Sequence, residues 1–180
     1  AIDTEFHREG TYFPKVALIQ IAWSEGNVAL LDPLSCDLTP LSGLFESEIK
    51  FVMHAAAQDL EVFLRVCGSV PKRLFDTQIS AGFLGLSTPS LAVLHQQYLG
   101  LDLPKEDRMT NWLSRPLTER QKTYAASDVR DLIAIYDFQT SRLNELGRLA
   151  WVEDECKSFL ERELVRRSPD EAWKRIKELK

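Results

Sequence analysis

Short apolar runs rich in β-branched residues mark the first part of the chain. Two of them cover residues 15–23 and 28–32, and the four residues between them, Ser24-Glu25-Gly26-Asn27, have the composition of a turn. This pattern predicts a β-hairpin. Shorter runs of the same kind predict two more strands, over residues 51–54 and 73–77.

Apolar residues recur at helical spacing in three later segments, over residues 59–66, 90–98 and 118–146. The last segment opens with a hydroxyl at Thr118 and an amide at Gln121, the pair that completes a capping box. Strands that pair early and then alternate with helices are typical of an α/β fold. We therefore expect a mixed central sheet with helices on both faces.

The C-terminal third has an almost entirely helical pattern. Residues 149–167 are amphipathic, and Ser168 followed by Pro169 begins another helix that runs to the end of the chain. A single helix after such a break resembles the first element of a further domain. The sequence thus predicts a main domain over residues 1–150, a helical extension over 151–167 and the start of another domain over 168–180.

The composition indicates the size of the core and the compartment in which the protein is expected. Hydrophobic residues make up 44% of the 180 residues, enough for one substantial core. The three cysteines form no C-x-x-C pair, and neither a membrane span nor a signal peptide is evident. We therefore expect a cytoplasmic protein that does not bind membranes. Because the chain begins at Ala1 rather than Met, we expect it to be part of a longer protein.

The net charge of −5 argues mildly against tight non-specific binding of nucleic acid, which depends on Lys and Arg. A bound divalent cation can, however, reverse the local charge of a carboxylate site. The charge therefore does not exclude a metal-dependent enzyme that acts on nucleic acid.

Three local patterns could carry chemistry. Asp3 and Glu5 are two residues apart, so on a strand both carboxylates would project from one face, where a cation would relieve their repulsion. Asp59 follows a strand that ends near His54, and Tyr124 and Asp128 share one face of a helix. Taken separately, each pattern is better explained by a solvated strand end, a helix cap, or a buried tyrosine beside an exposed acid.

Taken together and in order, these patterns resemble the tyrosine-bearing branch of the DEDD exonuclease superfamily. The flanking sequence resembles ribonuclease D over residues 1 to about 150. The matching segments are Asp-Thr-Glu-Phe, His-Ala-x-x-Gln-Asp-Leu-Glu-Val-Phe, Phe-Asp-Thr-Gln, Trp-Leu-x-Arg-Pro-Leu-Thr-x-x-Gln and Tyr-Ala-Ala-x-Asp-Val.

The resemblance implies a ribonuclease H-like fold and a catalytic domain over residues 1–150 whose N-terminal strand is truncated. Residues 168–180 would then begin a helicase-and-ribonuclease-D C-terminal domain. The implied activity is hydrolysis of RNA from a free, single-stranded 3′ end, in tRNA or other structured RNA processing. The implied cofactors are two divalent metal ions, Mg²⁺ or Mn²⁺.

The resemblance also assigns roles to individual residues. Asp3, Glu5 and Asp128 would hold the ion beside the attacking water. Asp3 would bridge to a second ion, which Asp59 would support directly or through water. Tyr124 would orient the water rather than act as a base, because an unperturbed phenol has a pKa near 10.

Substrate contacts are expected from aromatic and basic side chains, which stack on bases and pair with phosphates. Phe6 could pack against the terminal nucleotide, although core packing explains it equally well. His54 is interpreted as a core histidine whose hydrogen bonds are satisfied, with a role in shaping the turn before Asp59 as the alternative. Asp76 is interpreted as structural, as the cap of the helix that follows it. The segment before Tyr124 supplies the other candidates, for which a solvated loop is an equal alternative: Lys105, Arg108, Trp112 and Arg115.

Two other functions remain open on the sequence alone. One is a 3′→5′ exonuclease that acts on DNA, because nothing in the sequence places a contact to a 2′-hydroxyl. The other is a non-catalytic nucleic-acid-binding module on the same fold. The complete set of acids disfavours the binding module.

Overall fold

The computed structural model describes residues 1–24, 26–104 and 110–164. Its first three strands form an antiparallel sheet in the order β1-β2-β3, and the remaining two form a parallel pair. The predicted hairpin is confirmed as β2 and β3. The strands are β1 (Ile2–His7), β2 (Lys15–Trp23), β3 (Asn27–Leu31), β4 (Lys50–Met53) and β5 (Arg73–Asp76).

The helices follow the predicted spacing with three differences. The helix predicted over residues 90–98 is a four-residue helix, Leu91–Leu94, continued by a π-helical turn, His95–Leu99. A short helix that the sequence pattern did not predict begins next to Pro40, which fixes a helical φ in its first turn. The predicted run over 118–146 is two helices, which meet at Asp131. The helices are α1 (Thr39–Phe45), α2 (Ala57–Val66), α3 (Thr77–Phe83), α4 (Leu91–Leu94), the π-helical turn η1 (His95–Leu99), α5 (Glu119–Arg130), α6 (Leu132–Glu145) and α7 (Leu149–Leu164).

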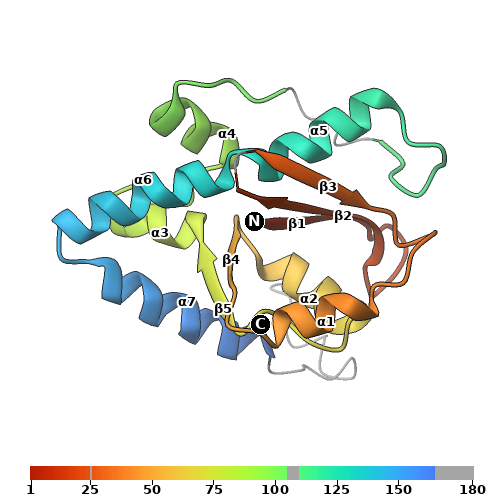
Figure 1. Cartoon of the computed structure of the whole chain (residues 1–180), viewed down its shortest axis with the longest axis horizontal. Coiled ribbons are helices and arrows are strands. Elements are labelled where there is room, and N and C mark those ends of the chain that lie inside the picture. Colours follow the sequence, from red (N-terminus) through yellow and green to blue (C-terminus); the bar gives the residue numbers. More distant parts are fainter. Residues whose placement is uncertain (25, 105–109, 165–180) are drawn as a thin grey trace, which may run out of the picture.

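The two sheets lie side by side, with β1 next to β4, so antiparallel and parallel pairs coexist as expected. Helix α5 packs on the three-stranded sheet from one side and α2 packs on it from the other (Figure 1). The main core lies on the α2 side, where Ile19 of β2 meets Phe45 and Phe63. This layering leaves one face of β1 beneath α5.

Helix α7 packs against β5, α3 and α2, and its Val152 and Cys156 are buried beside Phe75. The predicted helical extension therefore contributes to the packed body of the protein. Residues 168–180, predicted to begin a further domain, lie outside the described residues. None of the described helices is long and apolar enough to cross a membrane.

Candidate active site

Strand β1 presents two carboxylates on one face. Asp3 and Glu5 alternate with Ile2 and Thr4, whose side chains are buried. Ile2 is fixed in the main core. A register shift between β1 and β2 follows Glu5 directly, and such irregularities change the direction of neighbouring side chains. The strand therefore holds both acids toward α5.

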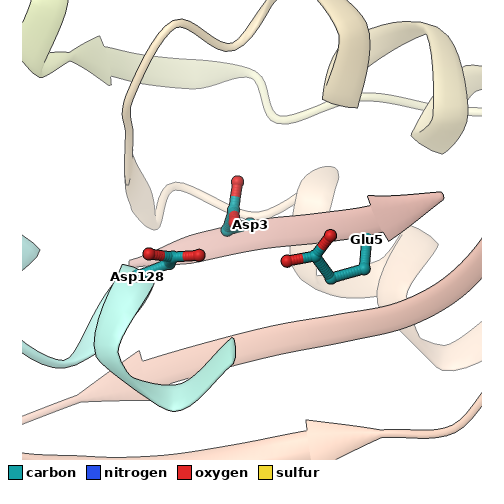
Figure 2. Close-up of side chains that lie close together, drawn as sticks. All are labelled: Asp3, Glu5 and Asp128. Atoms are coloured by element: carbon teal, nitrogen blue, oxygen red, sulfur yellow. The ribbon is translucent and has the colours of Figure 1, made fainter. Parts of the chain in front are cut away.

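Helix α5 brings a third carboxylate to the same place. Thr118 and Gln121 form the predicted capping box at its start, which fixes where the helix begins. Ala125 packs on β2 beside Leu18, and this contact turns Asp128 toward β1. One oxygen from each of Asp3, Glu5 and Asp128 lies within 4.8 Å of the others. Figure 2 shows the three side chains close together, two from β1 and one from α5.

Asp59 approaches the site from the other side of β1. It lies in the first turn of α2, and the residue that caps this helix is Ala56, without a side-chain cap. The reading of Asp59 as a cap, favoured when the pattern was taken alone, is therefore wrong. Its carboxylate instead accepts a hydrogen bond of 2.5 Å from the Thr4 hydroxyl. Asp59 is buried and raises the pKa of Asp3 by charge repulsion, so the two carboxylates share one electrostatic environment.

Asp76 fixes the turn from which α2 starts. It caps α3 as predicted, by accepting hydrogen bonds from the backbone of Gln78 and Ile79 at 2.8 and 3.2 Å. It also accepts from the amides of Ala55 and Ala56 at 3.2 and 2.8 Å. Ala55 has a φ of 54°, a left-handed conformation that non-glycine residues adopt at a cost. The buried Asp76 carboxylate therefore holds a strained turn immediately before Asp59.

His54 is partly buried and bonded within the turn before Asp59, which fits the alternative interpretation of this residue. Its Nδ1 lies 2.9 Å from the Thr77 hydroxyl, and that hydroxyl in turn donates to the carbonyl of Met53. Burial lowers the pKa of His54, which favours the neutral ring. His54 therefore contributes to the turn and not to the group of carboxylates.

Tyr124 lies one helical turn before Asp128 and is partly buried. Its ring centroid is 6.1 Å from that of Trp112. Burial raises the pKa of the phenol above its ordinary value, and the charges of Asp128 and Glu5 raise it further. The hydroxyl therefore keeps its proton at neutral pH and can act as a hydrogen-bond donor.

The carboxylates resist ionisation in the protein alone. Burial, and then repulsion by Asp128 and Asp59, raises the pKa of Glu5 to about 8. Burial also raises the pKa of Asp128 to about 7 and that of Asp59 to about 6. The pKa of Asp3 is raised well above its ordinary value by burial, and by the surrounding carboxylates. A bound cation would offset the repulsion between these carboxylates and favour their ionised forms.

The donor set indicates which cation fits. The group formed by Asp3, Glu5 and Asp128 offers carboxylate oxygens alone, and its members lie on a strand and a helix that are both held by core packing. Oxygen ligands of this kind suit hard divalent ions such as Mg²⁺ and Mn²⁺. The residues present therefore fit the metal ions that the family resemblance implies.

The predicted substrate-binding residues differ in how exposed they are and in whether the structure describes them. Phe6 is partly exposed beside Glu5. Trp112 is only 6% exposed and packs against Leu18 and Ala125, so it supports the site from within the core. Lys105 and Arg108 lie outside the described residues.

Arg115 has structural partners instead of a free guanidinium. It forms a two-point ion pair with Asp32, through Nε at 2.6 Å and Nη2 at 2.8 Å. It also donates to the carbonyls of Ala17 and Trp112 at 2.7 and 2.8 Å. These contacts do not support the expected substrate contact, and they tie the segment that carries Trp112 to the sheet.

Two polar residues of this region were not identified from the sequence. Thr4 lies between the two acids of β1, and the strand alternation alone could have indicated that its hydroxyl faces away from them. Gln20 is the only side chain able to both donate and accept hydrogen bonds within the apolar run of β2. A lone amide in such a run was the signal that could have drawn attention to it.

Comparison with known proteins supports the same assignment. Residues 1–144 match a family described as 3′–5′ exonuclease. Ribonuclease D of Zymomonas mobilis is 40% identical over 182 residues, which cover 98% of this chain and 46% of the relative. Ribonuclease D of Escherichia coli strain K12 is 41% identical and is covered to 48%. The chain spans about half the length of the curated relatives that it matches.

Solved structures agree with the family match. The crystal structure of E. coli RNase D, described as an exoribonuclease involved in structured RNA processing, has a TM-score of 0.89 and 40% sequence identity, covering 97% of this chain and 47% of that one. The catalytic core of RRP6 from Trypanosoma brucei has a TM-score of 0.82 and 25% identity, covering 88% and 45% of the two chains. The expected ribonuclease H-like fold and the resemblance to ribonuclease D are therefore confirmed, and the chain belongs to the 3′–5′ exonuclease family.

Proposed function

We propose that this chain is the catalytic part of a 3′→5′ exoribonuclease that hydrolyses phosphodiester bonds at RNA 3′ ends. The observation that carries the proposal is the convergence of Asp3, Glu5 and Asp128 from two distant segments, with their oxygens within 4.8 Å. Core packing does not require three partly buried acids at one point, and their mutual repulsion costs stability. Such an arrangement is typical of a site that binds cations.

Asp3, Glu5 and Asp128 would hold one divalent ion, and Asp59 would support a second ion that shares Asp3. When bound, two such ions supply charge neutralisation at the phosphate, an acidified water and stabilisation of the leaving oxygen. We propose Mg²⁺ or Mn²⁺, because the donors are carboxylate oxygens alone. Thr4 and Asp76 keep Asp59 in place through the hydrogen bonds described above.

Tyr124 would orient the attacking water. Its raised pKa keeps the phenol protonated at neutral pH, so no phenolate is available as a base and the hydroxyl acts by hydrogen bonding. In the reaction, water adds to phosphorus, and the bond from phosphorus to the 3′ oxygen of the preceding nucleotide breaks. That oxygen takes a proton and becomes the new 3′ hydroxyl, while the terminal nucleotide leaves as a 5′-monophosphate.

The RNA substrate is supported by the relatives, which are named ribonuclease D, and by the description of the E. coli enzyme. We propose a single-stranded 3′ tail on tRNA or another structured RNA as the substrate. Phe6, partly exposed beside Glu5, would stack on the terminal base. Lys105 and Arg108 would pair with phosphates.

We also propose a cytoplasmic location and a domain organisation for the protein. The cysteines are free thiols, as in a protein of the reducing cytoplasm. Residues 1–150 would form the catalytic domain, 151–167 a helical extension and 168–180 the start of a helicase-and-ribonuclease-D C-terminal domain.

The test uses single-stranded RNA and DNA of the same sequence, each labelled at the 5′ end, with Mg²⁺, Mn²⁺ or chelator. The expected result is a ladder that shortens from the 3′ end of RNA, needs a divalent ion and releases 5′-mononucleotides. Faster shortening of DNA would instead favour the DNA exonuclease. Binding without cleavage in either metal would favour the non-catalytic module, and internal cuts would reject all exonuclease readings.

A further inference from the structure

Gln20 is a fully buried glutamine in the middle of β2, with 0% of its surface exposed. Neither atom of its side-chain amide has a hydrogen-bond partner among the residues that the structure describes. A buried amide that leaves both its donor and its acceptor unpaired destabilises a fold. Its position therefore needs an explanation other than core packing.

The strand register locates this amide beneath the site. Gln20 lies directly opposite Asp3 of β1 and opposite Leu30 of β3. Directly opposite residues in an antiparallel pair project from the same face, with their Cβ atoms about 4.5–5.5 Å apart. The Gln20 side chain therefore projects on the side of Asp3 that faces α5.

Helix α5 covers the same spot from above. Two residues before Gln20, Leu18 packs against Ala125, and two residues after it, Ala22 packs against Val129. Gln20 lies between these two contacts, below the turn of α5 that carries Asp128. The neighbouring residues Ile19 and Ile21 project into the main core on the opposite side of the sheet.

Gln139, on α6, provides a comparison within the same protein. It is equally buried, and its amide oxygen has no partner among the described residues, but its amide nitrogen donates to the carbonyl of Thr77 at 3.0 Å. That bond explains Gln139 as part of the fold. Gln20 has no such bond among the described residues, and the residue directly opposite it on β1 is Asp3.

We propose that Gln20 is a positioning residue of the carboxylate site, whose amide nitrogen donates to Asp3, directly or through one water, when Asp3 holds a divalent ion. The inference rests on the proposed function, because it assumes a metal at this site. Ligating carboxylates are oriented by hydrogen bonds from outside the ligand set, and loss of such a partner typically weakens metal affinity about 10- to 100-fold. Gln20 would thus stabilise the metal-bound site, while its unpaired amide destabilises the metal-free fold.

The test replaces Gln20 by apolar residues of similar volume, Gln20→Met and Gln20→Leu, in the full chain. We expect both variants to keep or raise the melting temperature measured in chelator, because an unpaired buried amide is removed. We expect Mn²⁺ affinity, measured by calorimetry, to fall about 10-fold or more. The Mn²⁺ concentration needed for half-maximal RNA cleavage should rise in parallel, while KM for RNA stays unchanged.

The matched control is Gln139→Leu, which loses the bond to Thr77. It should lower the melting temperature and leave Mn²⁺ affinity unchanged. A lower melting temperature with unchanged Mn²⁺ affinity in both Gln20 variants would assign Gln20 to the fold and overturn the inference.

Asp128→Asn separates this inference from the proposed function. If the wild-type chain binds Mn²⁺, Asp128→Asn abolishes that binding and both Gln20 variants bind normally, the metal site stands and the role of Gln20 is overturned. If Asp128→Asn binds and cleaves like wild type, the proposed function itself fails.

Discussion

The hydroxyl of Thr4 donates a 2.5 Å hydrogen bond to the carboxylate of Asp59, 55 residues further along the chain. The two acids that flank Thr4 face α5, while Thr4 itself reaches the start of α2. One short strand therefore positions three of the four carboxylates: two by carrying them and one by hydrogen bonding.

Replacement of Thr4 by valine tests this relationship. The valine keeps the shape of the side chain but leaves the buried Asp59 without its hydroxyl donor. This should lower the free energy of unfolding by about 1–3 kcal/mol. We expect kcat to fall about 10-fold or more and the affinity for the second Mn²⁺ ion to fall more than that for the first. Thr4→Ser, which keeps the hydroxyl, should behave like wild type; equal losses in the two variants would contradict the role of the hydroxyl.

The role of Tyr124 predicts a different pattern. Tyr124→Phe removes only the hydroxyl, so Mn²⁺ affinity and KM for RNA should stay within about threefold of wild type. We expect kcat to fall about 100-fold or more, because the variant loses a group that orients the attacking water. Single-turnover cleavage of labelled RNA measures this step. A wild-type rate in Tyr124→Phe would refute the orienting role.

The raised pKa values predict how pH affects the metal-free protein. Between the ordinary pKa of 3.8 and the folded-state pKa of about 7, Asp128 keeps a proton in the folded state that the unfolded chain has lost. Its contribution to stability is therefore present below pH 4 and is lost as the pH rises toward 7. Glu5 extends the loss to about pH 8. Urea unfolding in chelator should show stability falling over this range.

Asp128→Asn isolates one part of that dependence. The amide does not titrate, so the variant should lose less stability than wild type between pH 4 and 8 in chelator. Added Mg²⁺ should stabilise wild type more at pH 8 than at pH 5, because binding requires ionised ligands. Identical pH profiles for the two proteins in chelator would show that Asp128 is not the group responsible.

Arg115 should prove structural. Arg115→Lys keeps the charge but loses the two-point contact with Asp32 and the bonds to the carbonyls of Ala17 and Trp112. We expect a loss of about 1–3 kcal/mol in the free energy of unfolding and an unchanged KM for RNA in the folded fraction. A raised KM with unchanged stability would restore Arg115 as a substrate contact.

The sequence by itself determined most of the elements and the identity of the acids. The runs of β2 and the capping box of Thr118 and Gln121 are local features, and local chemistry decides them. The family was suggested by the residue types and their order along the chain, which the sequence gives directly: Asp3, Glu5, Asp59, Tyr124 and Asp128.

Only the tertiary structure decided which polar side chains from distant segments form hydrogen bonds with one another. On the sequence alone, Asp59 is better explained as a cap, whereas in the fold it accepts a hydrogen bond from Thr4 of β1. The sequence left Arg115 equally open as a phosphate contact or part of a solvated loop, and the fold pairs it with Asp32 at 2.6 Å. The sequence could not show that the buried amide of Gln20 has no hydrogen-bond partner among the described residues. A hydrogen bond depends on which groups meet across the fold, and separation along the chain carries no information on that.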